Sequence, residues 1–350
     1  MESSSNTSLK LNSSLPSFPL PDEECLDKTF MLCITVFVLI TSLAGNSLVI
    51  RFVFRNLKQR KSPDKIFLLQ ISFSNLLACC VSLPLHYFDV VFIGRIPLSL
   101  NVANSLCFIK LFLLFFCLQV GHVTLSVLCY DRYEAITKFP QQRLLTYGIA
   151  KQASCGIIVC IFVIYFSSMI SYVIDFHSGN TICEGLQIRS MGQQGNAAHV
   201  SNIALIVVTV ILISTANTIC FWNLFLVDRK LRHHKDSVRS TLGDQSMVKE
   251  VRLVYSAVSF VITYSIVWIP FGVFRSLRNI FPSSTSIRCY YITAFTCSYM
   301  VFSLIPLLYI ITDKRIQNPI SKFSRKNRVA PDENSTRDTK GPKLTDEKGT

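Results

Sequence analysis

Charged residues are scarce in this sequence. Asp, Glu, Lys and Arg make up 16% of its 350 residues, hydrophobic residues make up 50%, and the mean hydropathy is +0.41. A water-soluble chain of this length carries more charge, because its surface needs many charged side chains. The composition therefore excludes an ordinary soluble domain.

Motifs of enzyme chemistry are also missing. The sequence has no glycine-rich phosphate loop, no nucleophile elbow and no His-Glu-x-x-His run, and its 13 cysteines show no metal-ligand spacing. We therefore expect no enzyme activity, no cofactor and no bound metal. The first 28 residues lack an apolar stretch, so no cleavable signal peptide is expected either.

Seven long apolar runs dominate what is present. They span residues 29–54, 66–92, 105–130, 150–174, 201–227, 251–274 and 288–311. Each is long enough to cross a bilayer, which takes roughly 20 residues, and in lipid such segments must be helical to satisfy their backbone. The predicted fold class is an all-α membrane protein built as a seven-transmembrane helix bundle.

Lysine and arginine distinguish the two sides of this predicted bundle. They gather after the first, third, fifth and seventh runs, and this basic side is expected to be cytoplasmic. The N-terminus is then extracellular and the protein a multi-pass protein of the plasma membrane. The net charge of +14 becomes a topology signal, so nucleic acid is not an expected partner. Asn6 and Asn12 are glycosylation sequons on the outer tail, whereas Asn334 lies inside and is expected to be unmodified.

Four cysteines fall on the outer side: Cys25, Cys107, Cys183 and Cys289. An even number in an oxidising compartment predicts two disulfides, and three pairings are possible. The other nine lie in or near apolar runs, where the default is a small buried hydrophobe.

Short motifs recur at fixed places along these runs. They are Gly45-Asn46 in the first, Cys107 and Asp131-Arg132-Tyr133 in the third, Trp268-x-Pro270 in the sixth, and Pro306-x-x-Tyr309 in the seventh. In their order and placement the chain resembles the rhodopsin-like (class A) G-protein-coupled receptors over about residues 29–322. The resemblance implies an extracellular tail at 1–28, a receptor domain at 29–322 with a short amphipathic cytoplasmic helix after helix seven, and a disordered cytoplasmic tail at 323–350.

The resemblance also implies a switch. It pairs Cys107 with Cys183 and, as in peptide and chemokine receptors, Cys25 with Cys289. It places Glu250 opposite Arg132, so that Arg132 would join helix three to helix six while Asp131 holds its other side. The alternative is that the charges only anchor the helix end at the membrane surface. The residues implied in coupling and switching are Asp131, Arg132, Tyr133, Glu250, Trp268, Pro270, Pro306 and Tyr309.

Several positions depart from the family pattern. Asn75 replaces an aspartate in helix two, Ile305 replaces a polar residue before the proline of helix seven, and Gly121 replaces a serine in helix three. We infer that the sodium site of many family members is lost, because no anion remains to hold the ion. His122 and Tyr264 replace apolar residues and are expected to form a hydrogen bond between helices three and six.

The ligand is constrained mainly by exclusion. Tyr299 stands where opsins carry the retinal lysine, and Leu114 stands where amine receptors carry an aspartate. Arg275 and Arg278 suit an acidic group on a ligand, and an acidic outer tail around Cys25 suits peptide receptors. The alternative is that these two arginines only offset the acidic tail. A peptide is the first expectation and an anionic lipid or nucleotide the second. The pocket candidates are Leu114, Trp268, Phe271, Arg275 and Tyr299.

Two other readings concern the class of protein. A transporter or channel would show inverted repeats, or paired broken helices with intramembrane charges, and neither is evident. A receptor-shaped decoy or scavenger that binds without signalling stays open, because many switch positions are altered. For a working receptor the resemblance implies a heterotrimeric G protein as partner and allows arrestin as another.

Overall fold

The computed structural model describes residues 28–57, 61–92, 99–138, 140–177, 196–237, 244–281 and 284–312. These residues contain seven helices long and apolar enough to cross a membrane, which confirms the predicted fold class. No β-strand occurs among them. The predicted helix after the seventh span and the predicted cytoplasmic tail at 323–350 belong to a separate unit, Asp313–Thr350, which lies outside the described residues, as do residues 1–27 of the outer tail.

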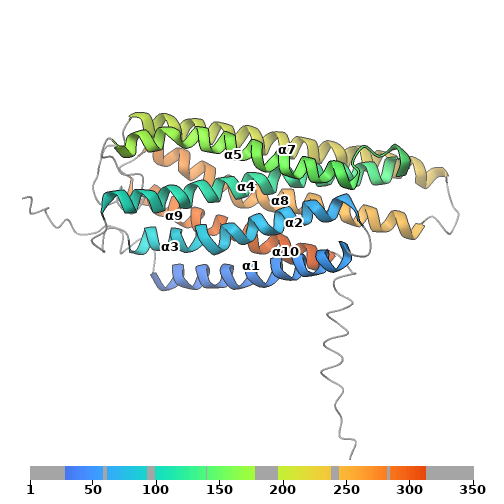
Figure 1. The fold of residues 1–350 in the computed structure, drawn as a ribbon, viewed down its shortest axis with the longest axis horizontal. Coiled ribbons are helices and arrows are strands. Elements are labelled where there is room, and N and C mark those ends of the chain that lie inside the picture. Colours follow the sequence, from blue (N-terminus) through green and yellow to red (C-terminus); the bar gives the residue numbers. More distant parts are fainter. Residues whose placement is uncertain are drawn as a thin grey trace, which may run out of the picture. The chain divides into compact units, whose positions relative to one another are not determined.

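The helices lie alongside one another (Figure 1). In chain order they are α1 (Lys28–Leu57), α2 (Pro63–Leu77), the π-helix η2 (Ala78–Ser82), α3 (Leu83–Val91), α4 (Leu100–Thr137), the 3-10 helix η3 (Pro140–Gln142), α5 (Tyr147–His177), α7 (Asn196–Ser237), α8 (Asp244–Ile280), α9 (Thr285–Ser298) and α10 (Val301–Thr312). The second span comprises α2, η2 and α3, and the seventh comprises α9 and α10.

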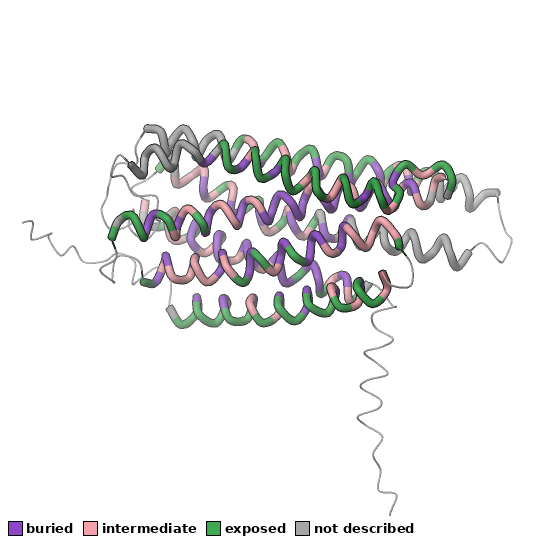
Figure 2. Tube along the Cα trace, viewed as in Figure 1, coloured by how far each residue is buried: buried purple, intermediate pink, exposed green. Residues whose placement is uncertain are grey.

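Helix α4 is the centre of the bundle. Of its most apolar membrane window 72% is buried, against 17% for α5 and 22% for α7. It packs against α2, α5, α7 and α8, and buried residues follow it along its length (Figure 2). The outer helices expose large apolar side chains such as Phe37, Trp222 and Ile266, as expected where lipid is the solvent.

A proline accounts for the irregularity in the second span. Pro84 has no N–H to donate to the carbonyl four residues earlier, and the helix widens into the π-turn of η2 just before it. This turn places Ser82 against α4, where its hydroxyl donates to the Lys110 carbonyl at 2.8 Å.

Candidate functional site

Arg132 lies near the C-terminal end of α4 between two carboxylates. Its Nη2 is 2.6 Å from Asp131 Oδ2 and 3.3 Å from Asp64 Oδ1. Asp64 sits in the first turn of α2, directly after Pro63, where the helix dipole favours an acid. The Arg132 and Asp131 side chains are buried, so these contacts act in a medium of low dielectric constant.

Asp64 is a partner that the sequence reasoning missed. The predicted partner, Glu250, belongs to α8, but its side chain lies outside the described part of the chain, so the contact between Arg132 and Glu250 stays a prediction. The signal for Asp64 was present, since a Pro-Asp start marks a helix N-terminus. What it lacked was any indication that this terminus would face Arg132 across the bundle.

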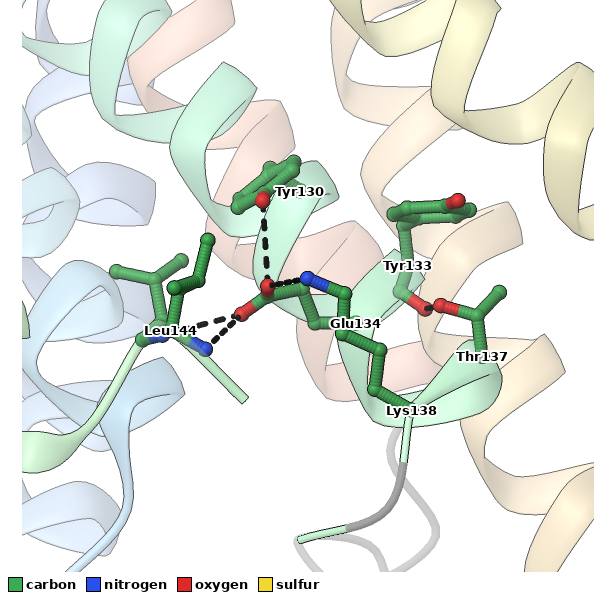
Figure 3. A network of polar contacts seen from close by, with 7 residues as sticks. Tyr130, Tyr133, Glu134, Thr137, Lys138 and Leu144 are labelled. Carbon is green, nitrogen blue, oxygen red and sulfur yellow. Dashed lines mark hydrogen bonds and ion pairs between the residues drawn. The ribbon is translucent and has the colours of Figure 1, made fainter. Parts of the chain in front are cut away.

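Glu134, two residues after Arg132 on α4, forms a second polar cluster (Figure 3). Its side chain is fully buried. Oε1 accepts from the Tyr130 hydroxyl at 3.1 Å and from Lys138 Nζ at 2.7 Å, and Oε2 accepts from the backbone amides of Leu144 at 3.1 Å and Leu145 at 3.0 Å. The hydrogen bond to Glu134 also raises the pKa of Lys138 above its usual range. Sequence reasoning did not single out Glu134.

The motifs of helices one and seven meet at Pro306. Because a proline has no N–H, the Phe302 carbonyl lacks its helical donor, and Asn46 Nδ2 at 3.1 Å and Ser42 Oγ at 3.3 Å of α1 donate to it instead. A Cβ on Gly45 would lie 3.0 Å from the Pro306 ring, so glycine permits the close approach. Asn46 therefore supplies the hydrogen-bond donor that Pro306 cannot provide within its own helix.

Trp268 belongs to a buried aromatic cluster between α8 and α4. Its ring is edge-on to Phe271 at 5.1 Å and lies 6.3 Å from Phe115. The Arg275 guanidinium lies over both phenylalanine rings, at 5.2 Å from Phe115 and 5.9 Å from Phe271. Three of the predicted pocket residues, Trp268, Phe271 and Arg275, are thus brought together.

The other two pocket candidates have different surroundings. Tyr299 is fully buried at the break between α9 and α10, and its hydroxyl is 2.8 Å from Ser82 Oγ. Phe295 connects it to the Trp268 cluster, because its ring is 5.8 Å from Tyr299 and 5.0 Å from Phe271. Leu114 is fully buried on α4.

A buried ion pair joins α3 to α4. Lys110 Nζ lies 2.6 Å from Asp89 Oδ2, with side-chain exposures of 0% and 1%, and 5.5 Å from the Phe295 ring centroid. The sequence analysis did not single out this pair. A lysine in one apolar run and an aspartate in another were the available signal.

Tyr264 fills the space beside Gly121. A Cβ on Gly121 would lie 2.6 Å from the Tyr264 hydroxyl, and the His122 and Tyr264 ring centroids are 4.0 Å apart. The predicted hydrogen bond between His122 and Tyr264 is wrong, because the Tyr264 hydroxyl has no hydrogen-bond partner among the described residues.

The three residues at the family's sodium position do not fit a cation. Asn75 is neutral and donates its amide to Asn46 Oδ1 at 3.2 Å, Gly121 has no side chain, and Ile305 offers no ligand atom.

We expect Gly121→Ala to destabilise the bundle by about 1–3 kcal/mol, because Tyr264 is fully buried and must shift to clear the new methyl group. Tyr264→Phe alone should be nearly neutral, because the hydroxyl that it removes makes no hydrogen bond among the described residues. In the double variant the nearest ring carbon would lie 3.6 Å from the new Cβ, which is ordinary contact. Thermal unfolding of the four proteins should show the double variant more stable than Gly121→Ala alone, and additive losses would contradict the clash.

Cys107 and Cys289 are both disulfide-bonded. Their predicted partners, Cys183 and Cys25, lie outside the described residues, as do Asn6 and Asn12. The pairings and the glycans therefore stay predictions. The nine cysteines assigned to the spans are free thiols.

These features are typical of seven-helix membrane receptors. A family model described as 7 transmembrane receptor (rhodopsin family) matches residues 45–309. The chain belongs to this family, which is a family of G-protein-coupled receptors and not of enzymes. A search of curated proteins found no match.

Proposed function

We propose that this chain is a plasma-membrane receptor that binds an extracellular ligand, with a peptide favoured, and activates a heterotrimeric G protein through outward movement of α8. The observation that carries the proposal is Arg132. This buried arginine of the central helix is paired with Asp131 and Asp64. A conformational change that breaks these ion pairs would make its guanidinium group available to a partner.

The outer half of the bundle supplies the other end of the switch. Trp268 lies two residues before Pro270 in α8, where the proline removes one helical hydrogen bond and weakens the helix locally. A ligand that contacts the cluster of Trp268, Phe271 and Arg275 would move this hinge. Helix α8 packs along α4, so its inner half would swing relative to Arg132. Such a ligand shifts the equilibrium only by its different affinities for the two states.

Two arginines favour a ligand that carries an acidic group. Arg275 lies over Phe115 and Phe271, and Arg278 lies 4.8 Å from the Tyr291 ring centroid. Planar guanidinium groups held on aromatic faces suit a carboxylate or phosphate. A peptide fits this and also the disulfide at Cys289, which in our proposal tethers the acidic outer tail. An anionic lipid or nucleotide is the second candidate, on the same two arginines.

Arg132→Ala should abolish coupling. The test is agonist-independent second-messenger output in cells, with surface amounts matched by labelling an outer epitope tag. Arg132→Lys is the matched control, because lysine keeps the charge but loses the planar fork, and it should retain partial output. Equal output from wild type and Arg132→Ala would overturn the assigned role of Arg132. No output from any G-protein class, with or without candidate peptides, would favour a decoy or scavenger.

A further inference from the structure

Hydrogen-bond donors occupy all the acceptor positions of the Glu134 carboxylate. A carboxylate offers about four acceptor positions, and Glu134 receives four donors: one hydroxyl, one ammonium and two backbone amides. Tyr130 belongs to its own helix, α4, and Lys138 is the residue that follows the end of α4. The two amides belong to Leu144 and Leu145, just before α5 begins. One buried side chain therefore ties the end of one membrane helix to the start of the next.

The segment between these helices is fixed at further points. Arg143 Nη2 donates to the Ala135 carbonyl at 3.0 Å, again at the end of α4. Thr146 caps α5, because its hydroxyl accepts from the Ile149 amide at 3.4 Å. Leu145 is buried, whereas Gln141, Gln142 and Leu144 are exposed. Ordered backbone thus carries side chains that face outward.

This ordered segment adjoins the coupling site. Glu134 comes two residues after Arg132 on the same helix, and Figure 3 shows it turned toward Leu144 while Tyr133 lies on another side of α4. A protein that binds at Arg132 therefore meets the segment as well. Ordering a loop on binding weakens affinity, and ordering it beforehand removes that cost.

We propose that Glu134 is a positioning residue for the G protein: by accepting the Leu144 and Leu145 amides it holds segment 140–145 in its binding position before the partner arrives. The proposal rests on the proposed function. Glu134 itself neither contacts the G protein nor takes part in the release of Arg132.

Glu134→Gln is the sharpest variant. Glutamine keeps the size, but it has one acceptor oxygen and places an N–H₂ group against donors that the carboxylate accepted. The full-length protein in lipid nanodiscs should then show faster amide hydrogen exchange at Leu144 and Leu145. With purified heterotrimeric G protein, the concentration giving half-maximal nucleotide exchange should rise about tenfold, because the loop must now become ordered on binding. The maximal rate should stay within about twofold, because the positions that release Arg132 are intact.

Tyr130→Phe is the matched control. It removes one donor to Glu134 and leaves both backbone amides bound, so amide exchange and half-maximal concentration should stay close to wild type. A general loss of folding would instead lower the maximal rate and the thermal stability. Unchanged amide exchange in Glu134→Gln, or faster exchange with unchanged half-maximal concentration, would overturn the positioning role. A wild-type protein that drives no G protein, but whose Glu134→Gln variant still loosens the segment, would overturn the proposed function and the partner assigned here.

Discussion

Lys110→Met should remove most of the correctly folded protein from the cell surface, and adding Asp89→Leu should bring much of it back. Lys110 and Asp89 are 2.6 Å apart and essentially inaccessible to solvent. Removing one partner from a buried ion pair costs about 3–5 kcal/mol, because the remaining charge stays in a medium that cannot solvate it. A typical domain has a total stability of only about 5–15 kcal/mol.

The double variant separates charge from packing. Replacing both charges with apolar residues of similar size leaves neither uncompensated, and such replacements are often neutral or stabilising. Surface labelling and thermal unfolding of the solubilised protein compare wild type, Lys110→Met, Asp89→Leu and the double variant. Lys151→Met is the matched control, because Lys151 is exposed on α5 over the Tyr147 ring and should tolerate the change. A double variant no better than Lys110→Met would show that the pair matters through packing or another contact.

The predicted spans were confirmed because lipid imposes a simple rule on sequence. Their ends were not, because apolar character marks the lipid boundary while a helix can continue into water. The run predicted at 201–227 belongs to α7, which covers Asn196–Ser237, and the run at 105–130 belongs to α4, which covers Leu100–Thr137. The π-turn of η2 could not be predicted either, because a run of apolar residues does not distinguish a π-turn from an α-helix.

The candidate site, too, could be predicted only in part from the sequence. Gly45, Asn46 and Pro306 could be selected as motifs, and the structure supplies the reason, since one carbonyl lacks its donor and one ring needs space. Lys110 and Asp89 could not be paired, because 20 residues of sequence separate two charges that only the packing of α3 on α4 brings together. The role of Glu134 could not be predicted for another reason: two of its partners are backbone amides, which every residue except proline has.

Asp64→Asn should raise agonist-independent signalling. The carboxylate of Asp64 lies 3.3 Å from Arg132 Nη2 and is mostly buried, so the variant removes one of two acids that hold the arginine. Loss of a charge-assisted bond of roughly 1–2 kcal/mol raises the active fraction about five- to thirty-fold while that fraction is small. Asp64→Glu is the matched control, because it keeps the charge at the same helix start and should stay near the wild-type output.

Glu250→Ala decides how many helices hold Arg132 at rest. If Glu250 also holds the arginine, as the sequence predicts, Glu250→Ala should raise basal output by itself, and the double variant with Asp64→Asn should exceed either single variant. If Asp64 and Asp131 suffice, Glu250→Ala should leave basal output unchanged and Asp64→Asn should carry the whole effect, because both acids come from the α2 and α4 side of the bundle. The measurement is second-messenger output against surface receptor number for wild type, both single variants and the double variant. An Asp64→Asn protein that reaches the surface normally and signals no more than wild type would remove Asp64 from the latch, and an equal failure of Glu250→Ala would reduce the Arg132 ion pairs to a structural anchor of the helix end.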